Sequence, residues 1–220
     1  ALREHKKGLM QQLFPSEGET QPRLRFPEFQ DAGEWEKAAI GQLGTVVTGN
    51  TPLTKQRDYY GGRHLFVSPS DMSDFRFVHT TQTTLSDLGF AQARAIPARS
   101  VLFVCIGSTI GKVSQNFDVC ATNQQINAVI PKAEQSGDFL YFLLSFASTD
   151  IAAAAGKQAV PIINKSSFSN IEVLVPLIEE QQRIADCLSA LDALIAAQAE
   201  KIAVLRTHKH GLMQQFFPPS

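Results

Sequence analysis

The sequence predicts a mixed α+β fold, in which a globular α/β domain is followed by one long α-helix of the coiled-coil type. Short apolar or β-branched segments alternate with turn-forming residues between about positions 23 and 178, a pattern typical of short strands. From Glu179 to Phe216 there is no proline and a single glycine, and Ala, Leu, Ile, Gln and Glu dominate. Such a composition favours an uninterrupted helix.

The bulk composition limits the classes of protein to consider. With 220 residues, of which 44% are hydrophobic, the chain is long enough for one substantial core with an appendage. Its apolar runs are far shorter than the ~20 residues of a membrane-spanning helix, and no charged leader precedes them. Cys105, Cys120 and Cys187 form neither a disulfide framework nor a zinc-type pair. We therefore expect a cytoplasmic protein without membrane contact.

The net charge of −1 argues against a protein that coats nucleic acid by bulk attraction, because such proteins are strongly basic. The distribution of charge is more informative than its sum. Two stretches, 88–117 and 151–171, contain no acidic residue. Their cationic residues are Arg94, Arg99, Lys112, Lys157 and Lys165. Both stretches could approach phosphates, although chance spacing explains the charge pattern equally well.

The two ends of the chain carry an internal repeat. Residues 2–15 read LREHKKGLMQQLFP and residues 205–218 read LRTHKHGLMQQFFP, so 11 of 14 positions are identical at an offset of 203 residues. Self-similarity of this kind shows how a chain is built from units. Together with the absence of an initiating Met, it indicates that the sequence starts at the end of one unit of a longer, duplicated protein.

The individual elements are predicted in order along the chain. Residues 16–22 are polar and contain Gly18, as expected of a surface linker. A helix is expected at 138–148, where aromatic and leucine side chains recur at helical spacing. Strands are expected at 45–48, 64–67, 101–106, 126–130 and 171–175.

The final helix carries an apolar stripe whose positions alternate by four and three, which is the seam of a coiled coil. Gln198 and Lys209 interrupt the stripe and either set its register or lie in solvent. At 1.5 Å per residue the helix reaches ~57 Å, more than a domain of this size spans, so we expect a second long helix to cover it. The helix-pairing residues are Ile184, Leu188, Leu191, Ile195, Ile202, Leu205, Leu212 and Phe216.

Known catalytic motifs do not fit this sequence. The segment from Gly107 to Lys112 has three residues between its glycines and is followed by Val113, whereas a phosphate-binding loop needs four and then Ser or Thr. Asn50-Thr51-Pro52 lacks the second proline and the aromatic residue of a base-flipping methyltransferase. The carboxylates are dispersed and the histidines lack zinc spacing. We expect no catalytic residue and no metal site in this chain.

Polar loops suited to nucleic-acid recognition remain. Arg and Lys side chains bind guanine edges and phosphates, and Asn and Gln side chains bind adenine. Three clusters combine such residues with turn formers, and each alone is weak evidence because surface loops are polar by default. Together with the glycine loop before Lys112, they give these candidate DNA-binding residues: Asn50, Thr51, Lys55, Arg57, Tyr59, Tyr60, Arg63, Ser108, Thr109, Lys112, Asn123, Gln124, Gln125, Lys157, Asn164 and Lys165.

Taken in order, these segments resemble the specificity subunit of type I restriction-modification enzymes. A Trp precedes an apolar strand at 35–43, and GNTP, YYGG, GSTIGK and TNQQIN follow. Pro176 and Glu180-Gln181 then open a long helix that ends KHGLMQQFF. The resemblance covers nearly the whole chain. Subunits of this family contain two target-recognition domains, each followed by a long helix, and the two helices pair antiparallel.

This chain is similar to the second half of such a subunit, which implies four parts. Residues 1–15 would be the tail of the preceding conserved helix and 16–22 a linker. Residues 23–178 would be the target-recognition domain, and 179–217 the spacer and dimerisation helix. A helix of ~57 Å limits the distance between two target-recognition domains on DNA to roughly 17 base pairs.

The resemblance also implies function and partners. The chain would be a non-catalytic subunit that reads one half of a bipartite site in double-stranded DNA. Its long helix would dock modification (methyltransferase) subunits, and a restriction motor subunit would complete the complex. No cofactor is expected here, since S-adenosylmethionine, ATP and magnesium belong to partner subunits. For the isolated half we expect an antiparallel homodimer through the helices.

Two other functions are compatible with parts of the sequence. The chain could be the recognition domain of a fused restriction-methylation polypeptide, but such an enzyme does not require the equivalent helix end 203 residues upstream. It could also be a coiled-coil adaptor that binds protein. An adaptor would show no sequence enrichment from a DNA library and little salt dependence.

Overall fold

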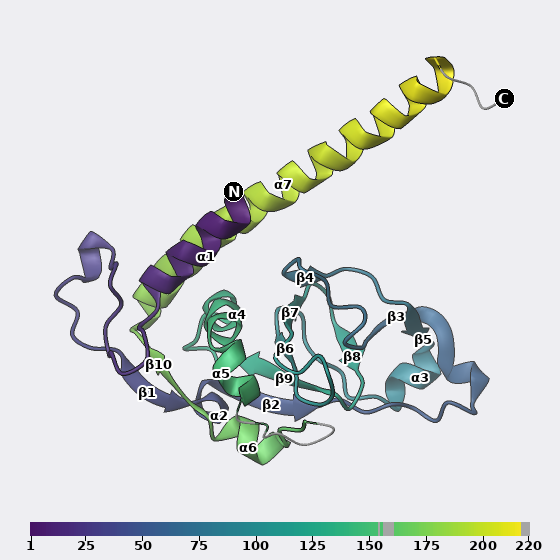
Figure 1. Ribbon diagram of the computed structural model, residues 1–220. Coiled ribbons are helices and arrows are strands. Elements are labelled where there is room, and N and C mark those ends of the chain that lie inside the picture. The colour runs from purple at the N-terminus through teal and green to yellow at the C-terminus, as the bar shows by residue number, and fades with distance from the viewer. Residues whose placement is uncertain (154, 156–160, 217–220) are drawn as a thin grey trace.

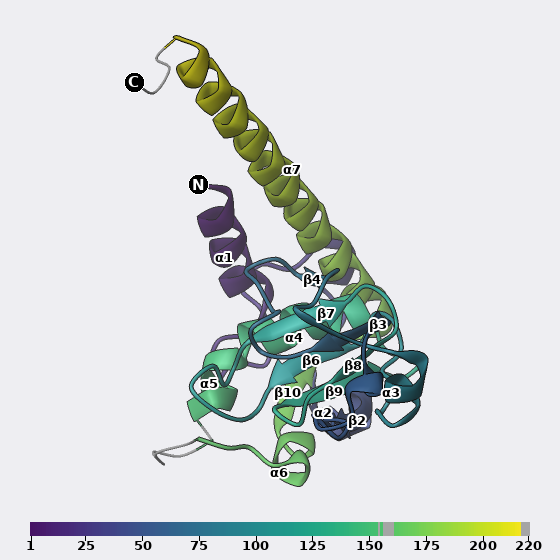
Figure 2. The ribbon, with the colours of Figure 1, turned by 90° about the vertical axis from the view of Figure 1, so that its right-hand side faces the viewer.

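The computed structural model describes residues 1–153, 155 and 161–216. A long helix, α7 (Ile178–Phe216), rises from one end of a mixed α/β domain, and the N-terminal helix α1 (Leu2–Leu13) lies along its first part (Figure 1). With 39 residues, α7 is about 58 Å long at 1.5 Å per residue. Figure 2 shows its C-terminal half projecting away from the domain.

The central sheet has five strands in the order β2-β9-β6-β7-β4. Neighbouring strands are antiparallel except for the parallel pair β4 and β7. All four residues of β6 are buried, which explains why this strand is a continuous apolar run in the sequence. The bounds are β2 (Gly44–Thr48), β4 (Phe77–Val78), β6 (Val101–Val104), β7 (Val113–Asn116) and β9 (Ile126–Pro131).

Two smaller sheets flank the central one. The first has the order β5-β3-β8, with β3 antiparallel to β5 and parallel to β8. The second is the antiparallel pair β1 and β10 at the base of α7. The bounds are β1 (Glu36–Ala39), β3 (Tyr60–Val67), β5 (Thr83–Leu85), β8 (Cys120–Thr122) and β10 (Glu172–Val175).

Short helices connect the strands, and several begin at a capping side chain. Ser136 caps α4 by accepting a hydrogen bond from the Phe139 amide, and Ser86 caps α3 through the Gly89 amide, which satisfies otherwise unpaired N–H groups. The bounds are α2 (Ile40–Leu43), α3 (Asp87–Ala91), α4 (Gly137–Phe146), α5 (Ser148–Ala153) and α6 (Lys165–Ser169), with 3₁₀ turns η1 (Pro27–Phe29) and η2 (Arg57–Tyr59).

The largest hydrophobic core cluster joins the domain to the two helices α1 and α7. Phe14, at the end of α1, is fully buried and stacks on Phe139 and Phe146 of α4, with Trp35 packed edge-on against it. Ile184, on α7, belongs to the same cluster. The end of α1 is therefore part of the domain core, because removing it would expose the aromatic side chains of α4.

Buried polar side chains fasten α7 to the domain. Gln181 accepts a hydrogen bond from the Ser136 amide and donates to the Pro176 carbonyl. Arg76, whose side chain is 4% exposed, pairs with Asp138 on α4 and donates to the Ser189 hydroxyl on α7. Burial lowers the pKa of Arg76, and Asp138 opposes that shift. These contacts fix the direction of the helix relative to the domain.

The predicted fold class is confirmed. The predicted strands correspond to β2, β3, β6, β9 and β10, and the two predicted helices correspond to α4 and α7. The expected apolar strand at 35–43 was wrong in its second half. There, residues 40–43 form α2, because Ile40 donates to the Ile171 carbonyl and the Gln42 side chain accepts from the Ala39 amide.

The apolar stripe of α7 divides into two halves. Ile184 and Leu188 are buried, and Leu191 is partly buried against the core. Farther along, Ile202 is 48% and Leu205 56% exposed. The domain and α1 together cover the first half of the stripe, whereas Ile202 and Leu205 in its second half lie in solvent. The half-buried Ile195 separates the halves, and the side chains of Leu212 and Phe216 lie outside the described part of the chain.

Among the residues that the structure describes, no helix is both long and apolar enough to cross a membrane.

Candidate nucleic-acid interface

Two of the predicted recognition loops meet at one end of the central sheet. Because β2 and β9 are antiparallel, the loop that leaves β2 and the loop that enters β9 lie at the same edge. The Gly49 amide donates to the Ile126 carbonyl at 3.1 Å, and the Thr51 hydroxyl donates to Gln124 Oε1 at 2.7 Å. The GNT and TNQQ segments therefore form one surface.

The glycine-containing loop after β6 joins the same surface. The Cys105 amide donates to the Gln125 carbonyl at 2.8 Å, and Gln125 Nε2 donates to the Ile106 carbonyl at 3.3 Å. Gly107 has φ +97°, a conformation that glycine adopts without the steric cost of a Cβ. Its amide donates to the Pro161 carbonyl at 3.0 Å, which brings the loop before α6 alongside. We call this surface, formed by residues 49–52, 105–112, 122–125 and 161–165, the loop cluster.

Several side chains of the loop cluster are exposed to solvent. Thr51, Ser108, Thr109, Gln124 and Lys165 are all exposed. The Thr51 hydroxyl donates to Oε1 of the Gln124 carboxamide, so the Nε2 donors of Gln124 take no part in this contact. Hydroxyl and carboxamide groups in this position are suited to hydrogen bonds with base edges or phosphates.

Other predicted residues hold the loops in place. Asn50 donates to the Gln92 carbonyl and accepts from the Arg94 amide. Asn123 and Gln125 are half-buried and hydrogen-bonded to each other. Since the polar atoms of these amides are engaged within the protein, they fix the backbone of the loop cluster.

Two further predicted residues at the cluster have part of their hydrogen-bonding capacity engaged. Asn164 is exposed but caps α6 by accepting from the Ser167 amide. Lys112 is half-buried, and its ammonium group donates to the Pro69 carbonyl at 3.1 Å. An ammonium group has three donors, so two of those on Lys112 remain for a ligand.

The GNTPLTKQRDYYGG segment extends from the loop cluster to the edge of the three-stranded sheet. Lys55, Arg57 and Arg63 are exposed there, and Tyr59 is half-buried. The Tyr60 hydroxyl donates to the Pro52 carbonyl, which ties the far end of the segment to the loop cluster, and burial raises the pKa of Tyr60. Lys157 lies outside the described residues.

His64 and Arg63 both contact Asp87 at that edge. His64 Nε2 lies 2.7 Å and an Arg63 guanidinium nitrogen 3.1 Å from Asp87 Oδ1. The hydrogen bond from His64, followed by the charge of Arg63, holds the pKa of Asp87 below its usual value. The carboxylate therefore partly neutralises the cationic side chains at this edge.

Arg94 is a further candidate, which the sequence-based assignment of site residues omitted. It is exposed, and its guanidinium donates to the Thr48 carbonyl at 2.7 Å, beside Asn50. In the sequence, the signal for Arg94 was its place in the stretch 88–117, which contains no acidic residue. Only the contact between residues 48–50 and 92–94 in the fold shows that Arg94 borders the loop cluster.

Within residues 1–153, 155 and 161–216, no group of three His, Cys, Asp or Glu side chains is placed to hold a metal ion. Burial raises the pKa of both Cys105 and Cys120 to about 12, which keeps these thiols protonated and unreactive. The fold and the loop cluster define a recognition module, in which polar loops at one end of a sheet are fixed to a long helix.

The chain belongs to the family described as "Type I restriction modification DNA specificity domain", whose sequence pattern matches residues 32–207. The specificity subunit of the HindI type I restriction enzyme from Haemophilus influenzae is 37% identical over 149 residues, covering 64% of this chain and 32% of that protein. The EcoR124I/EcoR124II specificity subunit from Escherichia coli is 30% identical over 170 residues, covering 74% of this chain and 42% of that protein.

Solved structures share the fold. The S subunit of a type I restriction-modification system from M. genitalium superposes with a TM-score of 0.72 at 14% identity, covering 100% of this chain and 55% of that one. The chain spans less than half the length of the curated relatives it matches. The family predicted from the order of the motifs is thereby confirmed.

Proposed function

We propose that this chain is a non-catalytic reader of one half of a bipartite DNA site, within a type I restriction-modification system. The observation that carries the proposal is the loop cluster. Four polar segments that are far apart in the sequence are hydrogen-bonded into one exposed surface at the end of the central sheet. Such a surface reads base edges with side chains and holds phosphates with cations and hydroxyls.

The side chains divide into two proposed roles. Gln124 and Arg57 are exposed and would contact bases, since carboxamide and guanidinium groups form paired hydrogen bonds to adenine and guanine. Lys112, Lys55 and Lys165 would contact phosphates. The remaining half-buried amides would position the loops. The proposed division of the chain remains 1–15 for a helix tail, 16–22 for a linker, 23–178 for the reader and 179–217 for the spacer helix.

Selection from a random duplex library tests the reading function. We expect enrichment of a short motif of a few adjacent base pairs, with affinity that falls as salt rises because phosphate contacts release counterions. Binding without enrichment would reduce the proposal to a general DNA-binding domain. An absence of salt-dependent binding would favour the protein-binding adaptor. The library must be duplex DNA, since the proposed site is double-stranded.

The packing of α1 indicates how two such units would join. Lys6 on α1 forms an ion pair with Asp192 on α7 at 2.6 Å, and its ammonium lies 4.9 Å from the ring centroid of Phe142. The repeat places Lys209, Phe216 and Phe217 at the positions of Lys6, Leu13 and Phe14. The C-terminal repeat therefore carries the side-chain types with which α1 docks.

We infer that the end of α7 docks onto the equivalent site of a second unit. In an isolated chain, that second unit would be another copy, in which the incoming helix end would take the place of α1. The resulting antiparallel homodimer would cover the exposed residues Ile202 and Leu205. Light scattering at micromolar concentration would then give about 48 kDa, twice the 24.1 kDa of one chain. A single species of 24.1 kDa would remove the homodimer from the proposal.

The exposed half of α7 would also dock the modification subunits, with a restriction motor subunit bound to the completed complex. Val204 is 62% exposed and is two residues from Ile202, so the two side chains do not share a face. Val204→Glu should weaken association with a purified modification subunit while leaving the homodimer intact. The matched change Ile202→Glu should weaken the homodimer. Equal binding by Val204→Glu and the parent would place the modification subunit elsewhere.

The fused restriction-methylation polypeptide is the alternative for the context of this chain. The internal repeat argues against it, because a single fused reader has no use for a second docking helix end. Sequencing the gene upstream of Ala1 distinguishes the two. A second target-recognition domain supports the specificity subunit, and a methyltransferase or nuclease domain supports the fusion.

A further inference from the structure

Strand β10 has an open edge within the part of the chain that the structure describes. Its sheet has the two-strand order β1-β10, and the register pairs Lys37 with Leu174 and Ala39 with Glu172. The peptide groups on the other side of β10 are therefore without a strand partner among the described residues. An open edge is a template for pairing with another chain, and proteins usually shield such edges.

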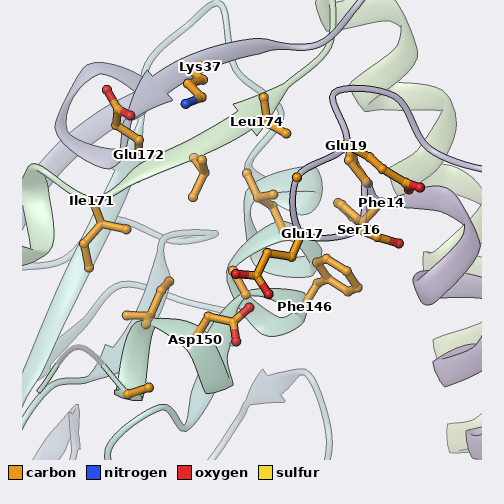
Figure 3. A pocket seen from close by; sticks show the side chains of 17 residues that line it. Phe14, Ser16, Glu17, Glu19, Lys37, Phe146, Asp150, Ile171, Glu172 and Leu174 are labelled. Atoms are coloured by element: carbon orange, nitrogen blue, oxygen red, sulfur yellow. The ribbon is translucent and has the colours of Figure 1, made fainter. Parts of the chain in front are cut away.

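A groove of about 590 Å³ runs along β10. Four consecutive residues, Ile171 to Leu174, line it, although alternate residues of a strand point to opposite faces. Lining by both faces is expected when a groove follows the edge of a strand. Figure 3 shows β10, with Glu172 and Leu174, on one side of the groove, and Phe146, Asp150 and Glu17 on the other.

The floor of the groove is apolar and its rim is acidic. Phe146, Ile151 and Ile171 contribute apolar surface. The rim carries four exposed carboxylates and the single ammonium group of Lys37. The carboxylates belong to Glu17, Glu19, Asp150 and Glu172. Of these carboxylates, only Glu19 lies within 4.0 Å of a described cation, at 3.9 Å from Arg23. The rim therefore repels phosphates and attracts cations.

We propose that this groove binds an extended, lysine- or arginine-containing segment of a partner protein, which adds to β10 as a further strand. Backbone hydrogen bonds to β10 would supply affinity, as in other cases of strand addition. Alternate side chains of the segment would point toward the apolar floor, and those between them toward the carboxylates of Glu17, Asp150 and Glu172. The acidic rim excludes DNA as the occupant, so this surface is separate in function from the loop cluster.

The length of β10 sets the size of the occupant. Four residues at about 3.3 Å each span about 13 Å, which matches a segment of four or five residues. A probe can therefore be a pentapeptide with blocked ends, Lys-Val-Lys-Val-Lys, because its valines suit the floor and its lysines suit the rim. The matched control is Glu-Val-Glu-Val-Glu, which has the same strand propensity and the opposite charge.

The test is an NMR titration of the full ¹⁵N-labelled chain with these two peptides. We expect saturable shifts of the amides of residues 171–174 and 146–151 with the lysine peptide, and none with the glutamate peptide. The double variant Glu17→Lys, Glu172→Lys should weaken binding about tenfold, since it removes two attractions and adds two repulsions. Reversing two carboxylates outside the groove, Asp118→Lys with Glu134→Lys, should leave the affinity unchanged.

A lysine peptide with N-methyl groups on alternate amides separates strand addition from simple charge attraction. Methylation removes backbone donors without changing charge, so placing the methyl groups on the amides that face β10 should abolish binding, and placing them on the other amides should not. Equal binding of all methylated forms would overturn the strand-addition proposal. Shifts confined to other surfaces, or none up to millimolar peptide, would overturn the groove as a binding site. DNA reading does not enter any of these outcomes.

Discussion

Arg25 and Glu180 form a two-point ion pair that lies almost entirely out of solvent. Arg25 Nε donates to Glu180 Oε1 at 2.8 Å and a terminal guanidinium nitrogen donates to Oε2 at 2.7 Å, with side chains 8% and 1% exposed. The hydrogen bonds that Arg25 donates to Glu180 raise the pKa of Arg25, against the opposing effect of burial. Because Glu180 lies in the first turn of α7, the pair fastens the start of the helix to the segment that leads into β1.

Breaking this pair should strongly destabilise the protein. Arg25→Ala leaves the Glu180 carboxylate buried without its cation, which typically costs about 3–5 kcal/mol. The free energy of unfolding in urea measures the loss. Arg183→Ala is the control, since its pair with Glu28 is about half exposed at 49% and 47% and should contribute less than about 1 kcal/mol. Comparable losses in both variants would show that burial does not decide the contribution of the pair.

Phe14 should contribute to stability as a core residue, although it follows the end of α1. It is fully buried against Phe139 and Phe146, so Phe14→Ala should cost about 3–5 kcal/mol. Chemical denaturation followed by the fluorescence of Trp35, which contacts the Phe14 ring, reports the change. Leu24→Ala is a useful comparison because Leu24 is 43% exposed. A small loss for Phe14→Ala would mean that α1 is only loosely attached.

The three thiols should react in two classes. Cys105 and Cys120 are buried, and burial raises the pKa of each to about 12, so both should react only after unfolding. Cys187 is partly exposed on α7 and should react in the native state. Titration with a chromogenic thiol reagent, with and without denaturant, counts each class. Three fast thiols in the native protein would contradict the burial of Cys105 and Cys120.

Asp87 should give the protein a small acid-dependent loss of stability. Its pKa is lowered below the ordinary 3.8 in the folded chain, chiefly by His64. A lowered folded-state pKa stabilises the protein above the unfolded-state pKa, and this contribution is lost as the pH falls through the folded-state value. The stability difference between the parent and Asp87→Asn should therefore shrink as the pH is lowered below about 4. A difference that is constant with pH would show that the contacts to His64 and Arg63 do not favour the charged carboxylate.

Base-reading and phosphate-binding residues should respond differently to substitution. Gln124→Ala and Arg57→Ala should relax preference at single positions of the selected motif, by about 1–3 kcal/mol each. Lys112→Ala should weaken binding to all sequences alike and reduce the salt dependence. Affinities for the selected duplex and for point-substituted duplexes, at two salt concentrations, distinguish the patterns. Equal effects of all three substitutions on selected and random DNA would contradict the assigned roles.

The sequence alone determined the elements with a strong local signal. The buried strands β6 and β9 are continuous apolar runs, and α7 has no proline and a stripe at coiled-coil spacing. The repeat and the order of the motifs determined the family. Short elements such as β4 and α2 were not predicted, because two to four residues carry too little periodicity and are set by pairing to distant segments.

Only the tertiary structure decided how the candidate site is assembled. Asn50 and Gln124 were equivalent as polar loop residues in the sequence. In the fold, Asn50 is engaged by Gln92 and Arg94, whereas Gln124 is exposed. Likewise, periodicity predicted one continuous stripe on α7, but the packing of α1 and α4 buries Ile184 and Leu188 and leaves Ile202 and Leu205 exposed. Periodicity shows which residues share a face, whereas the long-range contacts that cover a face or engage a side chain depend on the folded chain as a whole.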